Sequence, residues 1–313
     1  MNVRFIFLCW FLLLSCLTVF AQKTGRKYKV DRYSSIYLPL GRISFADSIV
    51  AFRLGDPPPI ASLQDATQCL HEPNYKNYHT PNFLSLGCKG SITVAFTDNG
   101  FMNLKGNDLY IFEVGPSREA ALVEISENGI DWIEAGTIAG GKSSIDLSDA
   151  GISSETVFYF LRITDLEELC RSKSAGADID AIAAINSVIR LTINADVLFD
   201  VAKFELKESA EITLKKLAEL IQQVDKATIL IEGHTDNDGS DDYNVKLSQD
   251  RCEAVLAKLQ SLFPENAMYD YDIRSYGESK PRVENSSEVN KQINRRVEIT
   301  VLPPNDYYDS IED

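Results

Sequence analysis

Two oppositely charged side chains, Asp236 and Arg251, have the types and the spacing to hold a charged ligand together. Asp236 lies in a polar loop that contains glycine, and Arg251 follows 15 positions later on an expected helix. A carboxylate accepts hydrogen bonds from an ammonium group, and a guanidinium donates a pair of hydrogen bonds to a carboxylate. A ligand end that carries both groups would satisfy both side chains, so the pattern indicates a zwitterion site.

A strand and a helix are expected to position this pair. The apolar run at residues 228–232 predicts a strand that leads directly into the loop. Ser240 is a good N-cap for the helix that follows. Spacings of three and four residues place three side chains on one face of that helix, namely Asn244, Leu247 and Arg251. The guanidinium therefore lies a few turns into a helix whose N-terminal amides favour an anion nearby.

The surrounding chain alternates strands with helices. An apolar stripe at helical spacing predicts a helix before the loop, formed by Leu214, Leu217, Ala218, Ile221 and Val224. Residues 197–199 and 296–302 are the expected first and last strands. We therefore predict a C-terminal α/β domain of the βαβαβ type over residues 191–302. The acidic tail at residues 303–313 is expected to be disordered.

The first half of the chain shows short strands separated by turn signals. Asn128 and Gly129 lie between two apolar runs, which is the strongest short hairpin signal in a sequence. Further strands are expected near residues 92–96, 109–114, 157–163 and 180–185, whereas helical periodicity is scarce. The sequence therefore predicts an N-terminal all-β, jelly-roll-like sandwich over residues 22–190, with a ligand that the pattern leaves open.

The N-terminus has the pattern of a signal peptide over residues 1–21. Arg4 supplies the positive charge, an apolar stretch follows, and Ala21 provides a small residue before the cleavage point. The alternative is a lipoprotein signal, because the residues before Cys16 are close to a lipobox. Either signal predicts export to the periplasm or the outer membrane.

Charge and cysteine content narrow the partners and the chemistry. The net charge of -15 argues against nucleic acid, because a phosphate backbone needs a basic protein surface. Export permits disulfides among the four cysteines that remain after signal cleavage. Cys252 is expected to be a buried thiol on the second-domain helix, and a bridge made by Cys88 is preferred. The pairing among Cys69, Cys88 and Cys170 stays open, because sequence alone does not choose it.

The second domain resembles the OmpA-like peptidoglycan-binding domains. The resemblance covers residues 197–301 with matching order and spacing. It is carried by Leu198-Phe199-Asp200, Gly233-His234-Thr235-Asp236-Asn237, Gly239-Ser240, Tyr243-Asn244, Leu247-Ser248, Arg251, Tyr276-Gly277-Glu278-Ser279 and Asn294-Arg295-Arg296-Val297-Glu298-Ile299. Val201-Ala202 and Cys252 depart from the usual pattern, and neither touches the expected site.

The resemblance implies a ligand for the charged pair. Asp236 and Arg251 would hold the free end of diaminopimelate in the peptidoglycan stem peptide, since that end carries one ammonium and one carboxylate. The peptidoglycan-binding set that follows from it is Asp236, Asn237, Asn244, Leu247 and Arg251. The structural alternative for Asp236 is a turn-forming aspartate, and the alternative for Arg251 is a partner in a surface ion pair. Arg295 and Arg296 would contact the glycan or support the loop by ion pairing.

Two further residues of this stretch have simpler explanations. His234 is expected to be a strand-end residue, neither a base nor a ligand. The acidic run from Asp236 to Asp242 does not fit an EF-hand, because Gly239 is fourth from Asp236 and the EF-hand loop needs glycine at its sixth position.

The first domain resembles the discoidin or galactose-binding-like sandwiches over residues 91–185. The resemblance is carried by Val123-Glu124-Ile125-Ser126, Asn128-Gly129, Trp132 and Tyr159-Phe160-Leu161-Arg162-Ile163. Such folds often bind glycans or calcium at loops, and carboxylate oxygens suit a hard cation. The candidate calcium ligands are Asp108, Glu113, Asp178 and Asp180. The alternative for these carboxylates is a solvated strand end.

The function favoured by the sequence is that of a non-enzymatic envelope protein. It binds the diaminopimelate stem peptide and anchors the outer membrane, or an associated module, to the cell wall, with no cofactor required. Glycans or envelope proteins are further candidate partners. The alternative is a glycan- or calcium-binding adhesin-like module that uses the OmpA-like domain as its wall anchor. A hydrolase is disfavoured, because the three histidines lack the spacing found in zinc proteases of the zincin class. Cys69, His71, His79 and Cys88 nevertheless offer side chains that could bind zinc.

Overall fold

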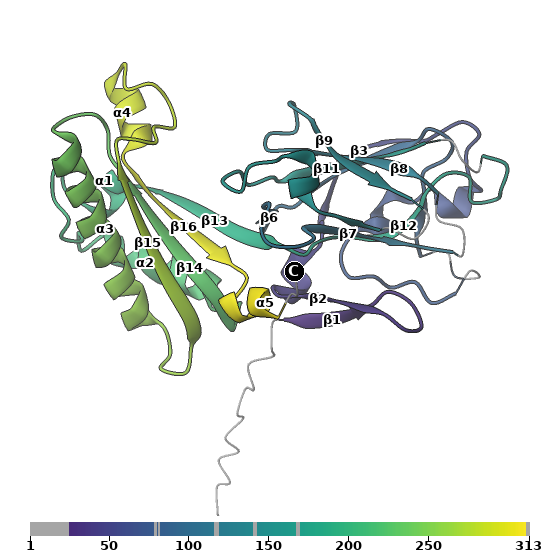
Figure 1. Ribbon diagram of the computed structural model, residues 1–313, viewed down its shortest axis with the longest axis horizontal. Coiled ribbons are helices and arrows are strands. Elements are labelled where there is room, and N and C mark those ends of the chain that lie inside the picture. Colours follow the sequence, from purple (N-terminus) through teal and green to yellow (C-terminus); the bar gives the residue numbers. More distant parts are fainter. Residues whose placement is uncertain are drawn as a thin grey trace, which may run out of the picture.

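The computed structural model describes residues 25–77, 80, 82–115, 119–139, 143–166 and 170–310. The expected signal peptide and Cys16 lie outside the described residues. Figure 1 shows a β-sandwich on one side and an α/β unit on the other. Among the described helices, none has the length and apolar character needed to cross a bilayer.

The sandwich consists of two antiparallel sheets that enclose one core. One sheet has the order β10-β7-β12-β4 and the other has the order β3-β5-β11-β8-β9. The strands are β3 (Ser48–Arg53), β4 (Leu84–Ser85), β5 (Ser91–Ala95), β7 (Leu109–Glu113), β8 (Ala121–Ser126), β9 (Ile133–Ile138), β10 (Ser144–Ile145), β11 (Phe160–Asp165) and β12 (Asp178–Ala184). Alternate residues of β11 are buried, because the side chains of a strand point to its two faces in turn. These sheets agree with the predicted sandwich, whereas its jelly-roll class stays a prediction.

The predicted hairpin at Asn128-Gly129 is confirmed. It joins β8 to β9, and these two strands pair antiparallel. The Asn128 side-chain oxygen accepts hydrogen bonds from the backbone amides of Ile130 and Asp131. Gly129 has a φ of 73°, a left-handed conformation that glycine adopts without steric strain.

The C-terminal half forms most of one mixed sheet, which has helices on one face. The strand order is β15-β14-β16-β13-β6, with β14 and β15 parallel. The strands are β6 (Gly100–Phe101), β13 (Ser187–Asn194), β14 (Lys226–His234), β15 (Met268–Gly277) and β16 (Arg296–Leu302). Helices α2 (Ala210–Ile221) and α3 (Asp241–Leu262) pack on the apolar side, where Ile229, Ile231 and Ile299 share their core. Helix α3 lies on the side of the sheet away from the sandwich (Figure 1).

Strand β13 connects the two halves. It pairs with β16 of the α/β unit and also with β6, which belongs to the first half of the sequence. Leu40, from the N-terminal half, lies in the core of the α/β unit. The sequence predicted no strand at β13, where it placed the domain junction. Residues 197–199, expected as a strand, instead belong mainly to the short helix α1 (Ala195–Leu198), which begins where the Asn194 side chain accepts a hydrogen bond from the Asp196 amide.

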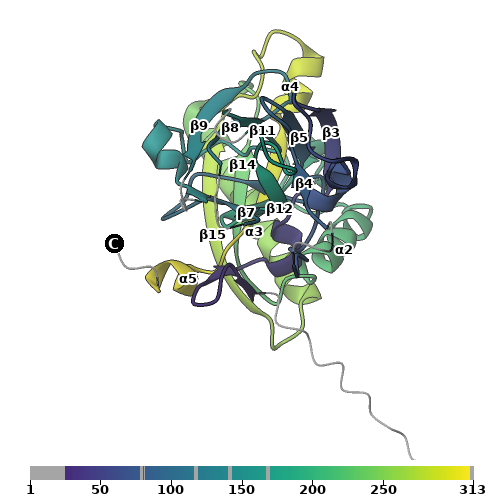
Figure 2. The same ribbon diagram turned by 90° about the vertical axis from the view of Figure 1, so that its right-hand side faces the viewer.

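The prediction of a wholly disordered tail was wrong. Residues Asn305–Asp309 form helix α5. Figure 2 shows α5 beside the N-terminal hairpin of β1 (Arg26–Lys29) and β2 (Ser35–Leu38). The Tyr307 ring lies 5.8 Å from the Tyr37 ring, and the Tyr308 hydroxyl donates to the Asn186 side chain at 3.1 Å. Acidic composition suggested disorder, but the contacts of Tyr307 and Tyr308 join the segment to Tyr37 and Asn186.

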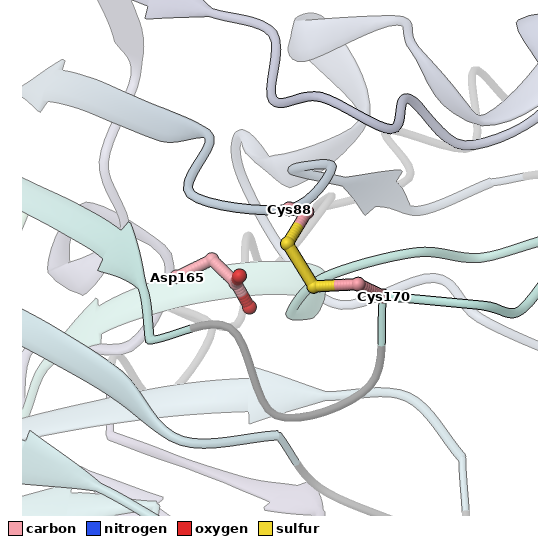
Figure 3. Close-up of side chains that lie close together, drawn as sticks. All are labelled: Cys88, Asp165 and Cys170. Atoms are coloured by element: carbon pink, nitrogen blue, oxygen red, sulfur yellow. A yellow bond between two sulfur atoms is a disulfide. The ribbon is translucent and has the colours of Figure 1, made fainter.

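A disulfide joins Cys88 and Cys170, so the preference for a bridge made by Cys88 is confirmed. Figure 3 shows Asp165 beside this bridge. Its carboxylate accepts hydrogen bonds from the backbone amides of Lys89 and Ala177, and thus ties together the two loops that the disulfide links. Cys252 is a buried free thiol, as predicted, and Cys69 is also buried and free. Cys88 is therefore no thiolate ligand for zinc, and His79 lies outside the described residues.

Candidate functional site

Strand β14 and helix α3 approach each other closely where the charged loop begins. A Cβ atom at Gly233 would lie 2.6 Å from the Ser248 carbonyl oxygen and 2.7 Å from the Cys252 sulfur. Only glycine fits this contact without displacing the helix. Ser240 caps α3 by accepting a hydrogen bond from the Tyr243 amide, as predicted. The loop between Gly233 and Ser240 is thus held against the first turns of the helix.

Asp236 is buried, with its side chain only 9% exposed. One carboxylate oxygen accepts a hydrogen bond from the Asp238 amide at 3.1 Å. The other accepts from the Arg295 guanidinium at 2.6 Å. The Asp236 carbonyl oxygen also accepts from Thr235 and Asn244 side chains. The carboxylate is therefore fixed by its neighbours and does not act as a simple solvated turn residue.

Arg251 is buried on the inner face of α3, with 3% of its surface exposed. Its Nε donates to the Lys203 carbonyl oxygen at 2.9 Å, and its guanidinium carbon lies 5.2 Å from the centre of the Phe199 ring. Within the described part of the chain, no hydrogen bond occupies its two terminal amino groups. Burial lowers the pKa of Arg251, while the charges of Asp196 and Asp236 act in the opposite direction. A buried guanidinium whose two terminal amino groups make no hydrogen bond to the described residues can donate two parallel hydrogen bonds to a carboxylate ligand.

Arg295 is the residue that links the loop to the rest of the site. Its guanidinium contacts Asp236 at 2.6 Å and Asp196 at 3.2 Å. Lys291, one turn earlier on helix α4 (Glu288–Asn294), pairs with Asp238 at 2.6 Å. Of the two roles considered for Arg295 from the sequence, the structure shows ion pairing to the loop. Asp196 and Lys203 were not foreseen, because neither carries a local signal of its own.

The remaining expected residues divide between the interior and the surface. Asn244 is 1% exposed and donates to Glu278 at 2.6 Å and to the Asp236 carbonyl at 3.3 Å. Leu247 lies on the same inner face of α3. Asn237 is exposed on the loop. The inner face therefore holds Asn244, Leu247 and Arg251 together, as their spacing predicted, and their binding role stays a prediction.

His234 lies at the end of β14, on the opposite face of the sheet from α3. Its ring stacks on Tyr276 at 5.2 Å. Burial lowers the pKa of His234 to about 4, and the positive charge of Arg296 adds to this effect. Arg296 itself is buried and donates to Glu298 at 2.6 Å. The imidazole is therefore neutral at neutral pH.

We expect His234 to make the protein less stable in acid. The unfolded chain takes up a proton as the pH falls through about 6.5, whereas the folded chain takes it up only near 4, so protonation favours the unfolded state in this window. Replacing His234 with phenylalanine removes the proton uptake. Between about pH 7 and pH 4.5, the loss of unfolding free energy should be smaller in this variant by about 2–3 kcal/mol. Urea unfolding at both pH values measures it, and equal losses in the two proteins would contradict the prediction.

Each of the four candidate calcium ligands accepts hydrogen bonds from its own set of donors. Asp108 accepts hydrogen bonds from the Leu104 and Leu147 amides and from the Asn186 side chain. Asp178 accepts from the Ser85 hydroxyl. Asp180 accepts from the Asn74 and Tyr75 amides, and Glu113 accepts from the Ser143 hydroxyl at 2.7 Å.

These carboxylates do not converge. Within the described ranges, they do not form a group of three whose oxygens lie within 4.8 Å of one another. Burial is the main cause that raises the pKa of Asp108 to about 6 and of Asp178 to about 7. They are therefore not solvated strand ends, and the calcium assignment stays a prediction.

Comparison with known proteins identifies the second domain. The model of the OmpA family matches residues 198–295. Outer membrane porin F of Pseudomonas aeruginosa is 34% identical over 141 residues, which cover 44% of this chain and 39% of the porin. Outer-membrane lipoprotein YfiB of the same species is 37% identical over 111 residues, which cover 35% of this chain and 64% of the lipoprotein. The chain thus spans less than two thirds of the length of either relative.

A solved structure gives a similar match. The cell wall anchor of the T6SS from Pseudomonas aeruginosa is 32% identical and covers 39% of this chain and 85% of that chain, with a TM-score of 0.33. Together with the family model, the sequence relatives show that this chain contains an OmpA-like domain at residues 198–295.

Proposed function

We propose that this protein is a non-enzymatic envelope protein that binds peptidoglycan and holds an outer-membrane assembly to the cell wall. The recognised group is the free end of diaminopimelate in the stem peptide. The observation that carries the proposal is the pair of buried opposite charges, Asp236 and Arg251, within the OmpA-like domain. The outer-membrane relatives support the compartment.

The charges of the site match those of the ligand. The diaminopimelate carboxylate would accept two hydrogen bonds from the terminal amino groups of Arg251. Its ammonium would donate to the Asp236 carboxylate, which it would share with Arg295. Because both side chains are already desolvated and held by neighbours, little ordering is needed on binding. A ligand that lacks the carboxylate leaves the terminal amino groups of the buried Arg251 without a partner, which costs about 1–3 kcal/mol or more, and a ligand that lacks the ammonium loses its hydrogen bond to Asp236.

A pull-down on purified sacculi of the diaminopimelate type tests this function. We expect the wild-type chain to co-sediment and the Asp236→Asn, Arg251→Gln double variant to remain largely in the supernatant. The matched control is Glu211→Gln, Lys258→Gln, which removes an exposed ion pair on α2 and α3 with the same neutral change in net charge. Undiminished binding by the site variant, with both variants folded by circular dichroism, would refute the proposal.

A further inference from the structure

A cleft lies between the polar face of the C-terminal sheet and the sandwich. Its volume is about 390 Å³, which falls in the range of small-molecule sites. Strands β14, β15 and β16 provide its floor, while Met102, Leu104 and Glu155 come from the first half of the chain. Neither Asp236 nor Arg251 lines it. This interdomain cleft is therefore separate from the proposed peptidoglycan site.

The floor of the interdomain cleft is polar although it is buried. Glu232 and His234 of β14 and Glu298 of β16 line the cleft, and each is at most 8% exposed. Their neighbours in sequence, such as Ile231 and Val297, point to the helices instead. A sheet face that only needed to pack against the sandwich would be apolar, because buried polar groups require hydrogen-bond partners.

The cleft is positive within an acidic protein. Five basic side chains and three acidic ones line it, which gives a local charge of +2 in a chain of net charge -15. The basic residues are Arg190, Arg274, Lys280, Arg282 and Arg296, and the acidic ones are Glu155, Glu232 and Glu298. A concentration of positive charge between two walls attracts anions.

The five cations differ in how fully they are paired. Arg296 donates to Glu298 and to the Asn294 and Lys280 carbonyl oxygens. Lys280 pairs with Glu155 at 2.7 Å and so bridges the two halves.

Arg274 and Arg282 have more exposed side chains and longer ion pairs than Lys280 and Arg296. Arg274 lies 3.5 Å from Asp272, and Arg282 lies 4.0 Å from Glu298. Their side chains are 51% and 50% exposed. Arg274 also donates a hydrogen bond to the Tyr276 side chain, so turning toward an incoming anion costs it that contact, whereas Arg282 gives up only a long, exposed ion pair.

One polar atom of the floor lacks a partner. His234 is 4% exposed, and its Nδ1 has no hydrogen bond to any of the described residues. Leaving a buried nitrogen unpaired costs about 1–3 kcal/mol. A ligand hydroxyl can either donate to or accept from this nitrogen, depending on the tautomer of the ring.

We propose that the interdomain cleft binds a small hydroxylated anion, such as an acidic sugar or a sugar phosphate. Its carboxylate or phosphate contacts Arg274 and Arg282, and one of its hydroxyls pairs with His234 Nδ1. Carboxylate and phosphate each present two oxygens that can accept parallel hydrogen bonds from one guanidinium. The proposal does not depend on peptidoglycan binding, because the two sites share no residue.

Isothermal titration calorimetry of the exported chain tests this site. The probes are N-acetylmuramic acid for a carboxylate, glucose 1-phosphate for a phosphate, and N-acetylglucosamine as a neutral sugar. We expect at least one anionic probe to bind saturably at millimolar concentration and the neutral sugar not to bind. The anion that binds more tightly shows whether the cleft prefers a carboxylate or a phosphate.

Two variants separate binding from folding. The double variant Arg274→Gln, Arg282→Gln should lower the affinity for the anion at least about tenfold, since each lost charged hydrogen bond has an effect of that order. Arg32→Gln, Arg53→Gln removes the same charge from exposed positions outside the cleft and should bind as wild type. His234→Phe should also weaken binding. Wild-type affinity in the first variant, equal loss in the Arg32 and Arg53 control, or no saturable binding of either anion would overturn the proposal.

Discussion

Replacing Arg251 with lysine is expected to weaken binding to diaminopimelate-type peptidoglycan by about 10- to 150-fold. Lysine keeps the positive charge but cannot donate two parallel hydrogen bonds to a carboxylate. It also loses the bond from Nε to the Lys203 carbonyl, which orients the guanidinium in the wild-type chain. A hydrogen bond to a charged group contributes about 1.5–3 kcal/mol, which corresponds to the stated range.

The same substitution should remove discrimination between wall types. A stem peptide with lysine in place of diaminopimelate keeps the ammonium but lacks the terminal carboxylate. The wild-type chain should therefore prefer the diaminopimelate ligand, and Arg251→Lys should bind both equally weakly. Affinities for the two synthetic stem peptides, measured by calorimetry, give the comparison. Arg171→Lys, at an exposed position, is the control. A variant that retains the full preference would show that Arg251 does not read the carboxylate.

Replacing Asn294 with alanine should destabilise the OmpA-like domain by about 3 kcal/mol or more. Asn294 is fully buried. Its oxygen accepts from the Arg282 and Val283 amides, and its nitrogen donates to the Val283 carbonyl and the Asn285 side chain. Alanine removes these four hydrogen bonds from partly buried surroundings, and each contributes about 0.5–1.5 kcal/mol.

Replacing Asn294 with alanine should also lower the affinity for the stem peptide. Asn294 precedes Arg295, which pairs with Asp236, so loosening the end of α4 releases the charged loop. Urea unfolding measures the stability, and the stem-peptide affinity reports on the loop. Val289→Ala, at a residue of the same helix that is 68% exposed, should change stability by less than about 0.5 kcal/mol. Equal unfolding free energies for Asn294→Ala and the wild type would contradict this account.

Local sequence signals predicted the elements that carry the two central charges. The strand before the loop, the cap at Ser240 and the inner face of α3 all follow from neighbours within a few residues. The hairpin at Asn128-Gly129 has the same origin. Features that depended on distant partners were missed or misjudged, such as strand β13 and helix α5. Strand β13 is stabilised by pairing with β16, and the paired residues Ile189 and Val301 lie more than 100 positions apart in the sequence.

The sequence by itself determined which side chains could recognise a zwitterion and on which strand, loop and helix they lie, because short-range periodicity and capping set those elements. Only the tertiary structure decided what surrounds them. Arg295 meets Asp236 from 59 positions away and Asp196 from 99, and the interdomain cleft joins residues of both halves. Such contacts arise from the packing of whole elements, and no local pattern of residue types records which distant side chains packing will bring together.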